Sequence, residues 1–111
     1  MKGYILPPLS PAVFYILLAL VHKDRHGYDI MHKATDYSDN IVIMSPGTLY
    51  GTLKRMLDDH LIEHSTVDPA QESDDQRRKY YHLTAGGKQI LGHELERYEK
   101  ALKIARQHKF I

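Results

Sequence analysis

Residues 45–55 carry side chains that are suited to contact a polyanion. Two cations, Lys54 and Arg55, follow small and hydroxylated residues at spacings that place them on the outer side of a helix. Small residues let a helix backbone approach base edges, while hydroxyl groups and cations donate hydrogen bonds to bases and phosphates. This pattern predicts recognition of duplex DNA through the following residues: Ser45, Gly47, Thr48, Tyr50, Gly51, Lys54 and Arg55.

A second basic cluster, Arg77, Arg78 and Lys79, lies at the start of an expected strand. These cations suit the phosphate backbone beside a recognition helix, although charges on a strand edge also discourage edge-to-edge aggregation. The preceding loop, 71–76, is acidic and therefore less suited to phosphate contact. We expect the basic cluster, rather than the tip of the loop, to contact DNA.

The sequence offers little for catalysis or metal binding. It has no glycine-rich phosphate loop and no nucleophile with a recognisable base, so we expect neither enzymatic activity nor a cofactor. Eight histidines raise the alternative of a metal-responsive regulator. The pairs His22/His26 and His60/His64 span the ends of expected helices, however, and cysteine is absent, so we expect no metal site.

The composition is that of one folded globular domain. With 111 residues, 42% of them hydrophobic and 26% charged, the chain is long enough for a single core. The absence of cysteine fits a reducing cytoplasm, and the longest apolar run, Pro11–Val21, is too short to cross a membrane. Because the formal net charge is only +1, the placement of charge carries the DNA-binding prediction.

Ser-Pro pairs at 10–11 and 45–46 predict the starts of two helices that position the polar stretch. The first, Pro11–Val21, is apolar around nearly its whole circumference, which indicates contact with a second partner surface. A short helix from Gly27 or Tyr28 to Tyr37 and a brief strand at 41–44 are expected between them. The inward residues of the later helix are Leu49, Leu53, Met56 and Leu57.

Two strands, Leu61–Ser65 and Arg77–Leu83, are expected after the third helix, separated by a polar loop. Three helices followed by a hairpin is the order of a winged helix-turn-helix, whose third helix enters the major groove. We therefore predict a mainly α fold with a small β-hairpin. In this fold, residues 1–84 form a winged helix-turn-helix DNA-binding domain.

Residues 85–111 are expected to form a C-terminal dimerisation helix. Thr84 is suited to cap this helix, although Gly86 and Gly87 weaken its first turn by roughly 1 kcal/mol each. Apolar residues then recur at the spacing of a coiled-coil seam, and they are Leu91, Leu95, Tyr98, Leu102 and Ala105. Because the helix is longer than a core of this size covers, we expect a partner helix from a homodimer.

Four segments of the sequence resemble the PadR family of regulators: HGYDI at 26–30, SPGTLYGTLKR at 45–55, LIE at 61–63 and RKYYHLT at 78–84. The similarity runs from about Leu9 into the last helix, whose shortness is similar to the compact branch of the family. The resemblance implies a dimeric repressor on a pseudo-palindromic operator, released by a small aromatic or multidrug-like ligand. It places Tyr15 and the last helix near the effector and dimer surfaces. Together with the aromatic residues and the seam, this gives the expected effector or dimer interface: Phe14, Tyr15, Leu91, Leu95, Tyr98 and Leu102.

Alternatives stand beside these expectations. A winged-helix protein-interaction module without DNA binding would suit the near-neutral charge and the acidic loop. A set of aromatic residues could line a cavity for a planar effector, but core packing and burial in a dimer explain the same residues. This set comprises Tyr4, Phe14, Tyr15 and Tyr98.

Overall fold

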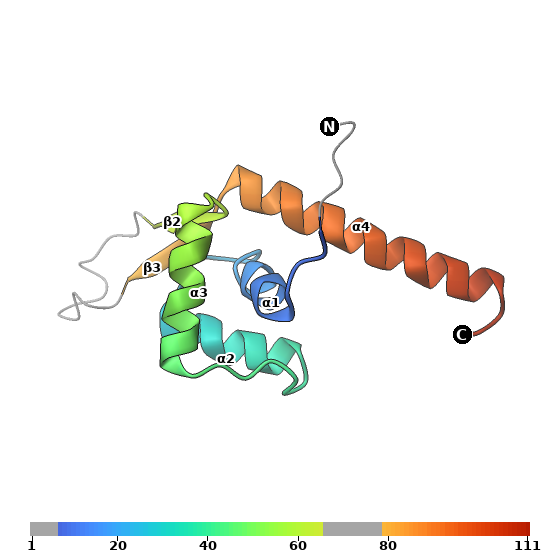
Figure 1. The fold of residues 1–111 in the computed structure, drawn as a ribbon, viewed down its shortest axis with the longest axis horizontal. Helices are drawn as coiled ribbons and strands as arrows, with labels where there is room; N and C mark the ends of the chain where they lie inside the picture. The colour runs from blue at the N-terminus through green and yellow to red at the C-terminus, as the bar shows by residue number, and fades with distance from the viewer. Residues whose placement is uncertain (1–6, 66–78) are drawn as a thin grey trace.

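The computed structural model describes residues 7–65 and 79–111. Three helices and a small sheet form a body from which the last helix extends outward (Figure 1). The elements in chain order are α1 (Pro11–Ala19), β1 (Arg25–His26), α2 (Gly27–Tyr37), α3 (Pro46–Asp58), β2 (Ile62–His64), β3 (Tyr80–Leu83) and α4 (Ala85–Gln107). The prediction of a mainly α fold with a small β-hairpin is confirmed.

The helix starts follow from their capping residues. Ser10 and Ser45 each accept a hydrogen bond at Oγ from the backbone N–H three residues further on, at 3.2 Å, and a proline follows each serine. Thr84 caps α4 in the same way. The start of α2 was not predicted in this form, because its cap is the His26 imidazole, which accepts from the Asp29 N–H at 3.2 Å.

Within the described residues the sheet has three strands, one more than the predicted hairpin, and the added strand is β1 rather than the segment 41–44. Its order is β1-β3-β2, and both pairings are antiparallel. In the β2–β3 pair, Ile62 lies opposite Leu83 and His64 lies opposite Tyr81. β2 and β3 are shorter than the expected strands 61–65 and 77–83, and residues 66–78 lie outside the described part of the chain.

The prediction of a strand at 41–44 is wrong. Val42 and Met44 are buried while Ile41 and Ile43 are 78% and 73% exposed, so the alternation of a strand is present without a pairing strand. The backbone groups of Val42 form hydrogen bonds with side chains at the end of α2 instead. The Val42 N–H donates to Ser38 Oγ at 2.9 Å, and the Val42 carbonyl accepts from Thr35 Oγ1 at 3.1 Å. Local side-chain hydrogen bonds have replaced a sheet ladder.

α1 lies at the centre of the body and contacts α2, α3 and α4. Its residues Ile16 and Leu17 are fully buried, in a core that includes Ile30 and Leu49. The second surface that α1 was expected to meet is therefore supplied by α4 of the same chain. The helix ends at Ala19 rather than at residue 21, and the Ala19 carbonyl accepts a hydrogen bond from Nε of the buried Arg25 at 2.7 Å.

Arg25 also binds α2, through an ion pair of 2.8 Å between its Nη1 and Asp29 Oδ2. Burial alone would raise the pKa of Asp29, but the hydrogen bond and the positive charge of Arg25 outweigh it and lower that pKa. The arginine thus joins the end of α1 to the start of α2.

The start of α4 is bound to the short segment that joins α3 to β2. Thr84 Oγ1 lies 2.7 Å from the carbonyl oxygen of His60 and 2.9 Å from that of Leu61. Gly87 is buried, and a Cβ added there would overlap the Leu61 carbonyl oxygen and lie 2.9 Å from Leu83 Cδ1. The sequence suggested only a weak helix start at this glycine, whereas the structure gives it a packing role.

Further along α4, Glu94 is only 1% exposed although it is a carboxylate. It accepts hydrogen bonds from the Leu9 N–H at 3.3 Å, from the Tyr98 hydroxyl at 3.1 Å and from Arg97. Burial alone would raise the pKa of Glu94, but these three hydrogen bonds lower it below the ordinary value of 4.5. The ionised network therefore stabilises the fold above about pH 4.5 and is lost as the pH falls through the lowered pKa.

Candidate nucleic-acid interface

α3 has one buried face and one polar face. Leu49, Thr52, Leu53 and Met56 are buried against the body, and the opposite face is centred on Gly51. All of the contact residues that the sequence predicted on this helix are exposed, and they are Ser45, Gly47, Thr48, Tyr50, Gly51, Lys54 and Arg55. The structure thus brings these residues to one side of the molecule and its edges.

The glycines of α3 have no packing role within the protein. A Cβ added at Gly47 would meet no atom within 4 Å, and one at Gly51 would meet only Arg55 Nη1, at 4.0 Å. A glycine inside a helix costs about 0.5–1 kcal/mol relative to alanine. Gly47 and Gly51 lower helix stability at an exposed face, and they leave the helix backbone there uncovered by side chains.

Tyr50 lies at the edge of the polar face and is 43% exposed. Its ring packs edge-on against Tyr28 at a centroid distance of 6.3 Å, and a Cβ added at Gly27 would lie 2.5 Å from its hydroxyl oxygen. Burial and the neighbouring Tyr28 raise the pKa of Tyr50 above 10.0. Tyr50 therefore presents a neutral hydroxyl at the surface and also packs on the start of α2.

The cations of α3 are held by local contacts. Lys54 Nζ lies 3.4 Å from Asp58 Oδ2, and both side chains are largely exposed. Such an exposed pair contributes little to stability, so Lys54 is available to another anion. Arg55 donates from Nη2 to Thr52 Oγ1 at 3.3 Å, which holds its guanidinium along the helix.

A groove of about 380 Å³ separates α3 from the sheet. Its lining residues are Tyr50, Leu53, Lys54, Leu57, His64, Lys79 and Tyr81. His64 and Tyr81 were not among the predicted site residues, although strand alternation places both on the side of the sheet that carries buried Ile62 and Leu83. Of the predicted wing-base cations, Lys79 lines the groove, while Arg77 and Arg78 lie outside the described residues, as does the acidic loop 71–76.

The opposite side of the sheet is held by Asp24, which the sequence analysis did not single out. Its Oδ2 accepts from Ser65 Oγ at 2.5 Å, and its Oδ1 lies 2.8 Å from His82 Nδ1. Burial alone would raise the pKa of Asp24, but these two hydrogen bonds and the nearby His82 lower it. One carboxylate thus binds β3 and the residue after β2 to the segment that follows α1.

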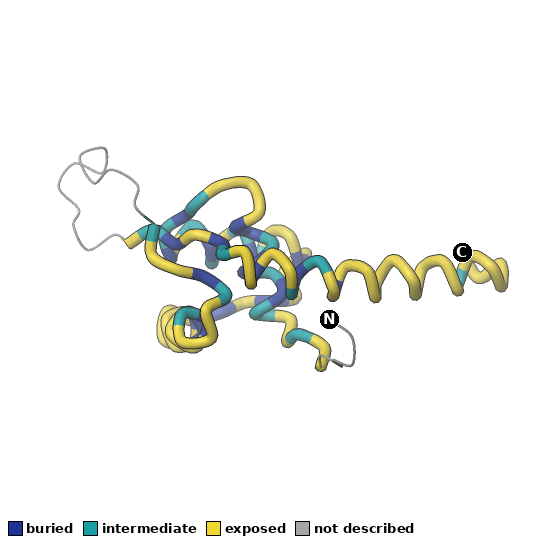
Figure 2. Tube along the Cα trace, turned by 90° about the horizontal axis from the view of Figure 1, so that it is seen from above, coloured by how far each residue is buried: buried dark blue, intermediate teal, exposed yellow. Residues whose placement is uncertain are grey.

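Most of the apolar seam of α4 lies beyond the body. Leu91, which the sequence assigned to an effector or dimer interface, is buried in the core of the single chain. Leu95, Tyr98 and Leu102 are 40%, 45% and 44% exposed. Together with Ala105 they form what we call the distal stripe, on the part of the helix that projects into solvent (Figure 2).

The aromatic residues between α1 and α4 pack against one another. Phe14 is buried, and its ring centroid lies 4.9 Å from that of Tyr15 and 5.2 Å from that of Tyr98. Three of the four aromatic residues considered for an effector cavity are therefore brought together, and the fourth, Tyr4, lies outside the described residues. Burial, together with the Glu94 carboxylate, raises the pKa of Tyr98.

The described residues form neither a metal cluster nor a membrane-spanning helix. Within residues 7–65 and 79–111, no three side chains of histidine, aspartate or glutamate gather as a metal site requires. Over the same ranges, no helix combines the length and the apolar character of a membrane span.

Three helices with an exposed third helix, followed by antiparallel strands, define the winged-helix class of DNA-binding domains. The family model for the transcriptional regulator PadR-like family matches residues 16–93. The chain belongs to this family, which consists of transcriptional regulators and not of enzymes.

Similar proteins agree with this placement. The structure of a PadR family transcription regulator from Clostridium difficile is 28% identical, with a TM-score of 0.66 over 89% of this chain and 98% of that chain. A PadR-like transcription factor from Bacteroides fragilis is 33% identical, with a TM-score of 0.62 over 86% of each chain. An uncharacterized protein of Lysinibacillus sphaericus is 30% identical over 80% of this chain and 79% of its own length. The predicted winged-helix fold is confirmed.

Proposed function

We propose that this protein regulates transcription by binding duplex DNA as a homodimer, with α3 in the major groove. The observation that carries the proposal is the exposed glycine pair, Gly47 and Gly51, on the polar face of α3. Helix propensity and packing within the chain give no reason for glycine there, whereas close approach to base edges does. Ser45, Thr48 and Tyr50 supply the neighbouring hydroxyl groups.

The cations around this face would bind phosphates. Lys54 and Arg55 are exposed on α3, and Lys79 lines the same groove as Lys54. Arg77 and Arg78 precede Lys79 in the sequence and would extend the same contact. Phosphate contacts fix the position of the protein on DNA, while the polar face of α3 reads the sequence.

The homodimer would form through the distal stripe. From Leu95 to Gln107 the helix runs about 20 Å beyond its last buried residue, Glu94. A free helix of this length is marginal in water, and a partner helix would cover its apolar side chains. In a dimer, two α3 helices about 34–36 Å apart would read a pseudo-palindromic operator.

A repressor role with release by a small aromatic ligand is the form of regulation that we propose. The supporting observation is that Phe14 and Tyr15 of α1 pack against Tyr98, the member of the distal stripe that lies next to the body. A planar ligand that stacks on these rings would shift α4 against α1, and thereby change the spacing of the two α3 helices.

Gly51→Ala separates a DNA-reading role from a structural one. The substitution is expected to raise the free energy of unfolding by about 0.5–1 kcal/mol, because nothing in the protein opposes the new methyl group. The affinity for the DNA upstream of the protein's own gene should nevertheless fall about tenfold, a loss of about 1.4 kcal/mol. Urea unfolding and fluorescence anisotropy measure the two effects.

Gly92→Ala is the matched control for this prediction. It makes the same exchange in α4, also into open space, and should stabilise the protein without changing DNA affinity. If Gly51→Ala binds DNA as well as the unchanged protein, the polar face of α3 does not read bases.

Lys54→Ala is expected to weaken binding about equally on the upstream duplex and on a scrambled duplex, because a phosphate contact carries no sequence information. The salt dependence of binding, as the slope of log K against log salt, should fall by about 1. Lys100→Ala, an exposed lysine of α4, is the control and should change neither quantity. Salt-independent or absent binding of the unchanged protein to both duplexes would instead favour a protein-interaction module.

A further inference from the structure

The groove between α3 and the sheet contains a histidine that the proposed DNA contacts do not yet use. His64 lies at the end of β2, on the same side of the sheet as Ile62, because the two are separated by one residue. Its cross-strand neighbour on that side is Tyr81, and their ring centroids are 5.2 Å apart. His64 is therefore positioned under α3 by the strand register.

Two lysines share the groove with this imidazole. Lys54 approaches from α3 and Lys79 from the residue before β3, and both line the same 380 Å³ space as His64. Lys54 forms an ion pair with Asp58 at 3.4 Å, and both side chains are largely exposed. Glu63 precedes His64 on β2 and lies opposite His82 in the strand register. Its side chain is therefore on the other side of the sheet.

The remaining titratable groups of the groove are two tyrosines. Burial and the proximity of another tyrosine raise the pKa of both Tyr50 and Tyr81. Their hydroxyl groups therefore bring no negative charge into the groove near neutral pH. Leu53 and Leu57 complete its lining, so the polar end of the groove is a cluster of cations and neutral hydrogen-bonding groups.

We propose that this groove binds one phosphodiester of the DNA backbone between Lys54, Lys79 and His64, and that His64 takes up a proton when the phosphate enters. The proposal rests on the proposed DNA-binding function and adds a pH dependence to it. Histidine gains or loses its charge between pH 5 and 8, and a nearby anion favours the charged form. DNA binding should therefore tighten as the pH falls, through a single identifiable side chain.

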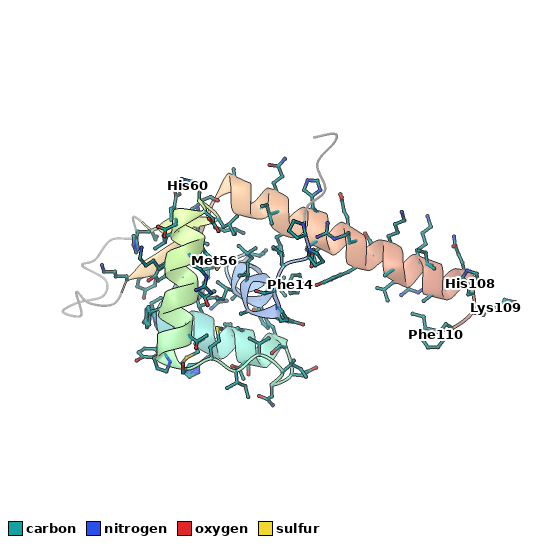
Figure 3. All side chains as sticks on the ribbon, in the orientation of Figure 1. Phe14, Met56, His60, His108, Lys109 and Phe110 are labelled. Carbon is teal, nitrogen blue, oxygen red and sulfur yellow. The ribbon has the colours of Figure 1, made fainter. Side chains whose placement is uncertain are left out.

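The experiment compares the affinity of the full chain for its upstream duplex at about pH 6 and about pH 8, at fixed ionic strength. We expect the unchanged protein to bind about three- to tenfold more tightly at the lower pH, with a salt slope steeper by about 0.9. His64→Gln should lose most of this difference. His108→Gln is the matched control, because His108 lies at the far end of α4 from the groove (Figure 3), and it should keep the whole difference.

His64→Lys provides a second test, in which the expected result is retained binding rather than weakened binding. A fixed charge at this position should give tight binding at both pH values. If His64→Gln and the unchanged protein show the same pH dependence and salt slopes, the inference about His64 is overturned while the DNA-binding function stands. If the unchanged protein does not bind the upstream duplex at either pH, the proposed function itself fails.

Discussion

Leu102→Glu is expected to convert the protein into a monomer that binds its operator about 100-fold more weakly. Leu102 is 44% exposed in the single chain and lies on the distal stripe, where a partner helix would cover it. A carboxylate buried in an apolar helix pair has no compensating partner and costs several kcal/mol. A monomer also loses the second half-site contact, and such avidity commonly accounts for a factor of about 100 or more.

Ile104→Glu is the matched control for this substitution. The exposed fraction of Ile104, 47%, is similar to that of Leu102. Because Ile104 lies two residues further along the helix, however, its side chain is on the opposite side. This variant should remain dimeric by light scattering and keep its DNA affinity by anisotropy. If both variants behave alike, dimeric or monomeric, the distal stripe is not the dimer contact.

Gly87→Ala is expected to lower the free energy of unfolding by about 1–3 kcal/mol, the usual cost of overpacking. The added methyl group would overlap the Leu61 carbonyl oxygen, which is backbone and cannot rotate away as a flexible side chain can. The start of α4 would have to move from the β2–β3 pair, and the hydrogen bonds of Thr84 to the same segment would weaken. Urea unfolding at a fixed protomer concentration measures the change.

The control is again Gly92→Ala, in the same helix. A Cβ at Gly92 meets nothing within 4 Å, so alanine should stabilise the helix by up to about 1 kcal/mol. Opposite signs for the two glycines would establish that Gly87 is required by packing rather than by helix propensity. A neutral or stabilising effect of Gly87→Ala would mean that α4 can shift from Leu61 at no cost.

The contact at Gly87 also bears on the proposed regulation. The helix that carries the distal stripe begins directly against the segment that joins α3 to β2. Any movement of α4 relative to the body would therefore act at the end of the proposed recognition helix. The buried Glu94 network adds a second attachment, between α4 and the residues before α1.

Sequence patterns were sufficient for the parts of the fold that depend on local interactions. The Ser-Pro starts of α1 and α3 and the Thr84 cap of α4 each involve a side chain and a backbone group three residues away. Helical periodicity predicted three buried residues of α3 correctly, Leu49, Leu53 and Met56. It did not predict Thr52, which is buried, and Leu57 is only partly buried. The same periodicity leaves Gly47, Gly51 and Lys54 outside.

The tertiary structure decided the features that depend on residues distant in the chain. Strand β1 has only two residues, too few for a periodic signal, and exists because β3 pairs with it. The segment 41–44 has the alternation of a strand but no strand beside it. In both cases the hydrogen-bonding partner, and not the local sequence, determines whether a strand forms.

The same reason applies to the candidate sites. Leu91 and Leu102 both belong to the seam, yet only Leu91 meets the core, because the body ends between them. His64 and Lys54 belong to different elements, and the β2–β3 register brings the imidazole to the groove beside α3. The sequence by itself determined which side of α3 faces outward, while the packing of distant segments decided which charges and apolar residues accompany it.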